Sequence, residues 1–271
     1  MTHDLTLGGA GATIDVDGYD NSISGVIDGG KLTKTGAGTL LLTGANTYTG
    51  DTEIDAGTLA VLEDANFGAN ASNRIIIGNA TLRLDESFNT ARNIDLTDAN
   101  STINVVDDGF NTLTGKLSGT GVLNKTGTGT LVLGGANGYQ GGTDIQSGIL
   151  QISDDGNLGD AAGAVAIAQG AELQFSQGVT SARDITLGAT GSTINTMTGN
   201  STLNGVIRVA NCTRLVQVHS FWQGKTVIVA VSLTAVSSRL AMIITLVKLV
   251  AQSFSMAERC NSPRTFQPLG R

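Results

Sequence analysis

Short segments in which apolar and polar residues alternate recur along the first three quarters of the chain. Most read Thr, then Leu or Ile, then any residue, then an aliphatic residue. Alternation with a period of two is typical of β-strands with one buried face, and the Gly, Asn and Asp between the segments suit turns. No segment of residues 1–205 carries a good helical stripe. The segments begin at Thr13, Thr39, Thr58, Thr81, Thr102, Thr130, Ile149, Glu172 and Thr193.

One phrase occurs twice, 91 residues apart. Residues 32–61 and 123–152 are identical at 17 of 30 positions, and the register continues without a gap, so that Arg92 falls on Arg183. Steps of 19, 23, 21 and 28 residues separate the segments from Thr39 onward, and steps of 19, 23 and 21 then recur. Because a building unit occurs as often as the structure needs it, the repeat indicates architecture before it indicates a catalytic loop.

This repetition predicts an all-β fold, a right-handed parallel β-helix with about four turns in each 91 residues. Stacking one turn on the next aligns Leu with Leu and Thr with Thr, at roughly 4.8 Å per turn. The alternative, an antiparallel sandwich, gives its strands different neighbours and has no reason for a constant internal phase. The segments would form one column on the order of 40 Å long. Its aliphatic core would dominate stability, since burying one Leu or Ile contributes about 1.5–3 kcal/mol.

Two sets of residues carry this prediction. Tyr48 and Tyr139 are interpreted as packing caps over Gly-rich bends in preference to sugar-stacking rings, and Lys34 and Lys125 as surface charges of the repeat. The inward ladder is predicted to contain Leu40, Leu42, Leu59, Val61, Leu82, Leu84, Ile103, Val105, Leu131, Leu133, Leu150 and Ile152. The turns are predicted to contain Gly36, Gly38, Asn46, Tyr48, Gly50, Gly127, Gly129, Asn137, Tyr139 and Gly141.

The composition changes near residue 207. Residues 1–205 hold 22 acidic and 8 basic side chains, and residues 206–271 hold one acid and eight bases, so net charges of −14 and +7 give the total of −7. The third unit stops partway, after Ile207. We therefore divide the chain into repeats over 1–207 and a non-homologous tail over 208–271, of undefined, helical or disordered structure. A reading-frame shift or an insertion-element junction would explain the tail, and the sheet edge left open at Ile207 predicts pairing with other chains.

Candidate metal chemistry is limited to one acidic loop. Asp15, Asp17 and Asp20, with Asp107 and Asp108 at the equivalent place, could supply oxygen ligands to calcium. The full EF-hand spacing and the Gly-Gly-x-Gly-x-Asp repeat are both missing. We therefore interpret these residues as solvated turn positions, and we predict no metal and no cofactor.

Catalytic candidates are equally few. His3 and His219 lie outside the repeat proper, so no Ser/His/Asp arrangement is indicated. Cys212 and Cys260 lack the spacing of a redox pair or a zinc site. The acidic net charge argues against a nucleic-acid partner. We predict a protein without catalytic residues.

One stretch of the tail has a membrane-like composition. Residues 226–251 are mostly apolar, but Arg239 and Lys248 interrupt the run. A spanning helix needs about 20 apolar residues, so we do not predict a transmembrane function.

Residues 32–61 and 123–152 resemble the autotransporter-associated β-strand repeat, whose pattern is K-x-G-x-G-T-L-x-L-x-G-x-N-x-Y-x-G-x-T-x-I. The resemblance extends over about residues 1–207. It implies a β-helical passenger stalk of a type V secreted protein of Gram-negative bacteria, displayed at the cell surface and threaded through a C-terminal outer-membrane barrel. It further implies a structural or adhesive role, with host or bacterial surface molecules as partners, and no enzymatic activity.

The chain departs from that family at both ends. No export signal follows Met1, and the tail lacks the alternating strands of about ten residues that a barrel needs. We therefore expect a non-functional fragment that does not reach the surface by itself. The alternative function is that of a polysaccharide-acting secreted β-helix enzyme, which would need clustered Asp, Arg or Lys and exposed aromatic rings.

Overall fold

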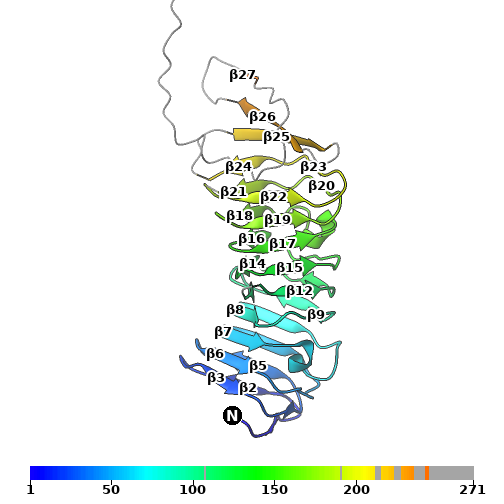
Figure 1. Ribbon diagram of the computed structural model, residues 1–271. Helices are drawn as coiled ribbons and strands as arrows, with labels where there is room; N and C mark the ends of the chain where they lie inside the picture. Colours follow the sequence, from blue (N-terminus) through cyan, green and yellow to red (C-terminus); the bar gives the residue numbers. More distant parts are fainter. Residues whose placement is uncertain (107, 190, 211–214, 223–226, 235–241, 244–271) are drawn as a thin grey trace, which may run out of the picture.

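The computed structural model describes the chain except for residues 107, 190, 211–214, 223–226, 235–241 and 244–271. Short strands stack into a tall column that rises from the N-terminal turn (Figure 1). Regular structure in the described residues consists of β-strands and two 3-10 turns, η1 (Asp64–Phe67) and η2 (Asp155–Leu158). Strand pairing is parallel as far as β24 (Ile207–Val209). The predicted all-β fold, a parallel β-solenoid, is confirmed.

The strands form three sides of the column. The first side contains, from bottom to top, β2 (Ala12–Asp15), β5 (Leu32–Thr35), the first half of β7 (Thr52–Val61), the first half of β8 (Ile75–Leu84), β10 (Ile94–Leu96) and β13 (Leu117–Ser118). The short pair formed by β20 (Thr180–Ser181) and β23 (Thr202–Leu203) lies on the same side nearer the top.

The second side runs through the whole column. It contains β3 (Asn21–Ile23), β6 (Thr39–Leu42), the second halves of β7 and β8, β11 (Thr102–Val105), β14 (Leu123–Thr126), β16 (Thr143–Ile145), β18 (Val165–Ile167), β21 (Ile185–Leu187) and β24.

The third side begins with the pair of β1 (Leu5–Thr6) and β4 (Ile27–Asp28). Above it lies a sheet of β9 (Asn89–Thr90), β12 (Phe110–Leu113), β15 (Thr130–Leu133), β17 (Ile149–Ile152), β19 (Glu172–Phe175) and β22 (Thr193–Thr196).

Aliphatic side chains fill the centre of the column. Leu42, Val61, Leu84 and Val105 are register partners in successive turns of the second side, and none is more than 1% exposed. The other eight residues of the predicted ladder are buried to the same degree. Each turn therefore covers the apolar face of the turn below, which a single turn cannot do alone.

The sequence predicted one continuous inward ladder. In the structure the ladder does not continue from Val105 to Leu133 in one column. Ile103 in β11 pairs with Lys125 of the turn above. Leu133 in β15 instead pairs with Leu113 below it, on the third side. The two halves of the predicted ladder therefore lie on different sides of the solenoid.

The cause is the length of the repeat. Four turns on the first side bring the chain from Leu32 to Leu117, and six further residues bring it to Leu123 on the second side. A unit of 91 residues thus makes four turns plus one side, and each copy is rotated by one side relative to the copy before it. The long step between Thr102 and Thr130 contains a full turn and this extra side.

The upper end of the second side is covered by the chain itself. β24 pairs antiparallel with β25 (Leu215–Trp222), which pairs with β26 (Val227–Thr234), and β26 pairs with β27 (Met242–Ile243). The expectation of an open edge at Ile207 is therefore wrong for this side, because Ile207 of β24 pairs with Val216 of β25. The parallel coil also continues through Val209. Most of the predicted tail lies outside the described residues.

Candidate functional site: the polar network of the repeat

Lys34 and Lys125 are buried, and the interpretation of them as surface charges is wrong. Lys34 lies in β5 with its side chain directed into the column, because alternate residues of a strand face alternate sides. Its Nζ donates to the backbone carbonyls of Thr35, Gly36 and Ala56 at 3.1, 2.9 and 2.9 Å. These contacts join the strand end of one turn to the turn above it.

The second copy repeats this arrangement on the next side. Nζ of Lys125 donates to the carbonyls of Thr126, Gly127 and Ser147 at 3.0, 2.7 and 3.0 Å. An ammonium group has three donors, and in both copies each donor meets one carbonyl. The lysine of the motif therefore supplies hydrogen bonds that the backbone of the corner lacks.

Burial affects the protonation of both lysines. Desolvation lowers the pKa of Lys125 to about 8. Desolvation also lowers the pKa of Lys34, and the charge of Asp15 opposes that change. The three carbonyls favour the charged form in each copy, so the ammonium is kept by hydrogen bonds against a desolvation cost.

The Gly-x-Gly that follows each lysine is needed by the corner. Gly36 has a φ of 78° and Gly127 a φ of 74°, in the left-handed region that favours glycine. At Gly38 the backbone approaches the turn below so closely that a Cβ would lie 2.1 Å from the carbonyl oxygen of Tyr19. The K-x-G-x-G pattern thus encodes a buried ammonium next to a tight corner.

Tyr48 and Tyr139 are fully buried, so neither ring is available to stack on a sugar. Each hydroxyl shares a hydrogen bond with a threonine four residues later, Thr52 at 2.6 Å and Thr143 at 2.7 Å. A Cβ on Gly68 would lie 3.0 Å from the ring of Tyr48, so this ring packs directly against a bend of the turn above. Burial raises the pKa of Tyr48 to about 12 and also raises that of Tyr139.

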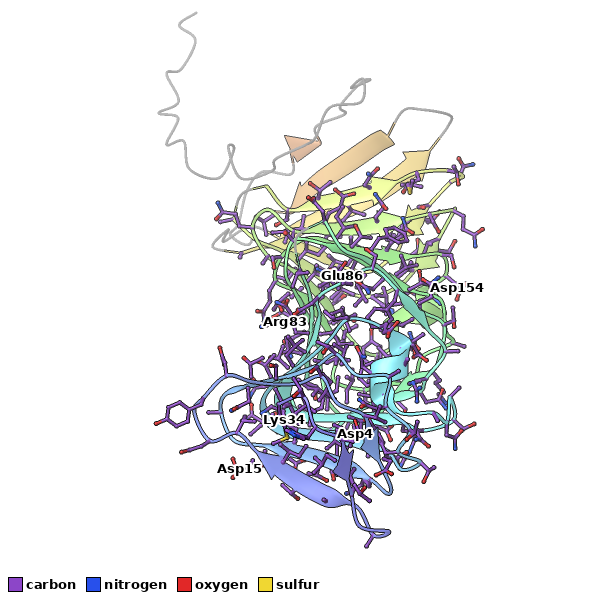
Figure 2. The ribbon with its side chains drawn as sticks, turned by 60° about the horizontal axis from the view of Figure 1, so that its bottom comes forward. Asp4, Asp15, Lys34, Arg83, Glu86 and Asp154 are labelled. Atoms are coloured by element: carbon purple, nitrogen blue, oxygen red, sulfur yellow. The ribbon has the colours of Figure 1, made fainter. Side chains whose placement is uncertain are left out.

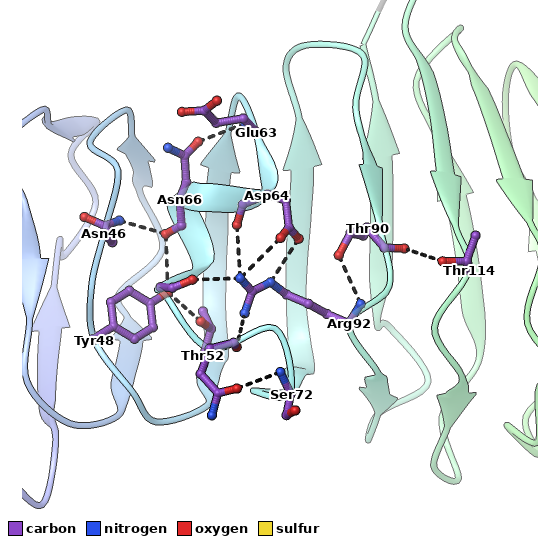
Figure 3. Close-up of polar contacts among 12 residues, drawn as sticks. Asn46, Tyr48, Thr52, Glu63, Asp64, Asn66, Ser72, Thr90, Arg92 and Thr114 are labelled. Carbon is purple, nitrogen blue, oxygen red and sulfur yellow. Dashed lines mark hydrogen bonds and ion pairs between the residues drawn. The ribbon is translucent and has the colours of Figure 1, made fainter.

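Asparagine side chains bridge successive turns beside the tyrosines (Figure 3). The amide of Asn46 donates to the carbonyl of Asn66 at 2.7 Å, and the amide of Asn66 donates to the carbonyl of Gly44 at 2.9 Å. Asn137 and Asn157 make the corresponding bonds, at 2.6 and 2.8 Å. Backbone groups at a corner without strand pairing are thereby satisfied by side chains.

Arg92 completes the network in the first copy (Figure 3). Only 2% exposed, it reaches from the turn above to η1, where Nε donates to Asp64 at 2.9 Å. Its terminal nitrogens donate to the carbonyls of Gly68 and Asn70, both at 2.7 Å. The guanidinium also lies over the ring of Phe67, 5.8 Å from its centroid. One side chain thus contacts the irregular segment at several points between Asp64 and Asn70.

Arg183 does the same for η2 and is 3% exposed. Its Nε donates to Asp155 at 3.0 Å, and it also donates to the carbonyls of Gly159 and Gly163 at 2.8 and 3.1 Å. The sequence predicted no role for either arginine. The available signal was their equivalence in the 91-residue register, since a charged residue retained at one repeat position in a chain poor in bases suggests a structural contact.

The carboxylates of the acidic loop accept hydrogen bonds from the backbone of the loop itself and of the turn above. The amide of Asp17 donates to Asp15 Oδ1 at 2.8 Å, and the amide of Thr39 donates to Asp20 Oδ1 at 2.9 Å and lowers the pKa of Asp20. Across the described residues, no group of three or more His, Cys, Asp and Glu side chains is placed to hold a metal ion. Asp107 lies outside the described residues.

The remaining candidates lie at the ends of the chain. His3 is exposed in the first turn. The side chain of His219, together with Cys212 and Cys260, lies outside the described residues. In the part of the chain that the structure describes, no helix has the length and apolar character to cross a membrane.

Comparisons with known proteins agree with the repeat. Residues 32–61 and 123–152 match the family described as Passenger-associated-transport-repeat. Over 159 residues, 53% of the chain, the sequence is 38% identical to the adhesin BmaC autotransporter of Brucella suis biovar 1 (strain 1330), of which this segment covers 5%. Two matches to extracellular serine proteases of Serratia marcescens are 50% identical over 66 residues and 42% identical over 78, and cover 6% and 7% of those proteins.

The chain thus spans less than a tenth of the length of each of these relatives. No solved structure matches it. The repeat motif, the parallel solenoid and the adhesin match point in one direction: the chain is similar to autotransporter passengers, and two of its segments match the passenger-associated-transport repeat.

Proposed function

We propose that residues 1–209 serve as a stalk in a surface-displayed passenger and hold adhesive parts of the parent protein away from the cell. A C-terminal outer-membrane barrel of the intact parent would bring the stalk to the surface. Host or bacterial surface molecules would be the partners of the adhesive parts. The adhesin relative supports this proposal, because its match covers 53% of the chain.

The observation that carries the proposal is the unbroken parallel register of the second side, from β3 to β24. A column stacked in this way lengthens by roughly 4.8 Å with every turn. Its polar groups also serve the column: the buried lysines and arginines of both copies bond to the backbone of neighbouring turns, and the buried tyrosine hydroxyls bond to threonine side chains. Length and stiffness are therefore what this sequence encodes most directly.

A display experiment tests the proposal. The full chain is inserted between an epitope and an outer-membrane anchor, and the height of the epitope above the membrane is measured by super-resolution microscopy or energy transfer. We expect the height to increase by an amount on the order of 40 Å. The variant Leu84→Asp, which places a charge in the buried ladder, should reduce the height, while Thr81→Ser on the outer face of β8 should not. An unchanged height on insertion of the chain would contradict the proposal.

A second pair of assays separates the stalk from the alternative enzyme. Beads coated with the chain are tested for aggregation, and the chain is incubated with a panel of polysaccharides. A stalk leaves the polysaccharides intact, whereas release of reducing ends would reverse the assignment. Bead aggregation by this segment alone would add an adhesive role to the structural one.

A further inference from the structure

The exposed large apolar side chains within the described coil occur in, or directly beside, one loop of the repeat. Tyr19 is 74% exposed and Phe110, which lies 91 residues later, is 50% exposed. Met197, at 57%, lies in the same loop of the third copy, and the remaining one is Met1 at the chain end. Chance would scatter such residues over the many turns of the solenoid. Their recurrence at one loop indicates a surface that the repeat presents for contact.

The rotation of the copies distributes these loops around the column. The loop with Tyr19 joins β2 to β3, at the edge between the first and second sides. The loop before Phe110 joins β11 to β12, at the edge between the second and third sides. The loop with Met197 joins β22 to β23, which returns to the first side. Each edge of the column therefore carries one exposed apolar side chain.

Two of the loops have a matching backbone. Asp17 and Asp108 have φ values of 49° and 58° and are the non-glycine residues with positive φ among those described. In the first loop the amide of Tyr19 donates to the carbonyl of Val16 at 2.9 Å. In the second, the amide of Phe110 donates to Ser87 Oγ at 2.9 Å. These bonds fix the backbone at each of the two exposed rings.

The same two loops are acidic. Asp15, Asp17 and Asp20 are exposed around Tyr19, and Figure 2 shows Asp15 near the N-terminal end of the column. The cation that acts electrostatically on Asp20 is Arg83, whose guanidinium is bound by Asp85 at 2.6 Å.

Phe110 has acidic neighbours too. Asp108 precedes it by two residues, and Glu86 lies in the turn below, where its carbonyl accepts from Asn111 at 2.8 Å. The other side-chain atom of Asn111, Oδ1, is buried and has no hydrogen-bond partner. This Oδ1 lies beside Gly109 of the loop, 3.5 Å from where a Cβ would be, so an unused acceptor adjoins the second corner.

The third loop provides a natural contrast. Residues 197–200 read Met-Thr-Gly-Asn and contain no acid. The side chain of Met197 is contacted by the amide of Gln151, whose Nε2 lies 3.4 Å from the sulfur. This loop shares the exposed apolar group with the other two but not their charge.

We propose that the corners around Tyr19 and Phe110 are contact points for lysine or arginine side chains of a partner protein. An aromatic face attracts a cation, and adjacent carboxylates add Coulomb attraction. Burial of Lys34, Lys125, Arg92 and Arg183 removes half of the eight bases of residues 1–205 from the surface, which leaves the outer face more acidic than the sequence charge suggests. Because the two corners point in different directions, one stalk would bind two separate basic segments and cross-link its surroundings.

Binding of a fluorescent Lys-rich peptide to the full chain tests this proposal by anisotropy. We expect Tyr19→Ser and Phe110→Ser each to weaken binding at their own corner about two- to fivefold, and the double variant to show both losses. Asp17→Asn and Asp108→Asn keep a residue type that tolerates positive φ, so they should weaken binding through charge alone. Met197→Ser is the matched control and should leave affinity unchanged. Raising the salt concentration should weaken binding further.

The outcomes that overturn the proposal are distinct. The proposal would be wrong if the peptide did not bind. It would also be wrong if the ring variants, Tyr19→Ser and Phe110→Ser, bound the peptide as well as the unmodified chain. Binding of a neutral dextran that is lost in the ring variants, with no response to the charge variants, would assign the corners to carbohydrate instead. If Met197→Ser weakened peptide binding as much as Tyr19→Ser and Phe110→Ser, the peptide would be binding non-specifically to exposed apolar side chains, and the proposal would be wrong. The far-ultraviolet circular dichroism spectrum and the Tm show that each variant is folded.

Discussion

The two complete copies of the repeat build the same polar network on different sides of the column. Lys34 and Lys125 each bind three carbonyls, although one belongs to the first side and the other to the second. The arginine clamps differ in their packing: Arg92 lies over Phe67, whereas the position equivalent to Phe67 is Leu158. The network is therefore specified by the order of residues along the turn and not by the side of the column on which it falls.

The arginine clamps should show the largest effect in that comparison. Arg92→Leu and Arg183→Leu each leave a carboxylate and several carbonyls of the 3-10 segment without their donor. The carboxylates are 36% and 26% exposed, so most of the loss comes from the buried carbonyls, each of which costs about 1–3 kcal/mol when it is left without a donor. We expect Arg92→Leu to cost more by about 0.5–1 kcal/mol, because the contact with Phe67 is also lost. Urea unfolding, monitored by circular dichroism, measures the loss of stability in both variants.

A half-exposed arginine, Arg74, serves as the control for the two buried ones. Arg74→Leu removes an arginine that is half exposed and ion-paired to Asp51 at 3.0 Å, so its cost should be less than about 1 kcal/mol. Equal losses in the free energy of unfolding for the buried and exposed arginines would show that the buried arginines do not stabilise the fold more than a surface ion pair does.

The core ladders of the two copies should respond alike. Leu84→Ala on the second side and Leu133→Ala on the third side each remove a side chain that is 1% exposed. Large-to-small changes of this kind cost about 2–5 kcal/mol. Matched losses in urea unfolding would agree with equivalent environments on different sides. If Leu133→Ala were harmless, the placement of the second ladder in the centre of the column would be wrong.

The buried lysines predict a dependence on pH. The pKa of Lys125 is about 8 in the folded chain and lies near 10.5 when unfolded, so between these values the unfolded chain binds more protons. Stability should therefore rise as the pH increases through 8 toward 10, by up to about 1.4 kcal/mol per pH unit. The window ends near pH 10, because unfolded tyrosines then begin to ionise while the buried Tyr48 stays protonated.

Two lysine variants make this prediction specific. Lys125→Met should abolish most of the rise with pH while it lowers stability at neutral pH, because the carbonyls of Thr126, Gly127 and Ser147 lose their donor. Lys116→Met, which changes an exposed lysine, should leave the rise intact. If stability rose with pH at the same slope in both variants, the pH dependence would come from groups other than Lys125.

The sequence revealed the ladder but not the rotation, and the reason is physical. Period-two alternation reports which residues point inward, and Leu42, Val61, Leu84 and Val105 do stack in register. It does not report on which side a strand lies, because all three sides bury the same kind of face. Only the step of 28 residues before Thr130, longer than the other steps, hinted at an extra side.

The polar network was hidden for a different reason. A lysine in a strand is exposed in most proteins, and the three carbonyls that bury Lys34 come together only when the corner has folded. Arg92 lies 28 residues from Asp64 in the chain, so nothing local links them. Pairing across turns is a property of the stacked column, and only the equivalence of Arg92 with Arg183 in the repeat made it visible in sequence.

The tyrosine hydroxyls provide the finest test of the equivalence of the two copies. Tyr48→Phe and Tyr139→Phe keep the ring against its bend and remove one hydrogen bond, to Thr52 or Thr143. Each should cost about 0.5–1.5 kcal/mol in urea unfolding. Tyr48 also lies 3.4 Å from the carbonyl of Asn66, so its loss should be slightly the larger. Exposed Tyr19→Phe is the control and should be silent; a loss there as great as at Tyr48 would mean that burial of the hydroxyl is not what matters.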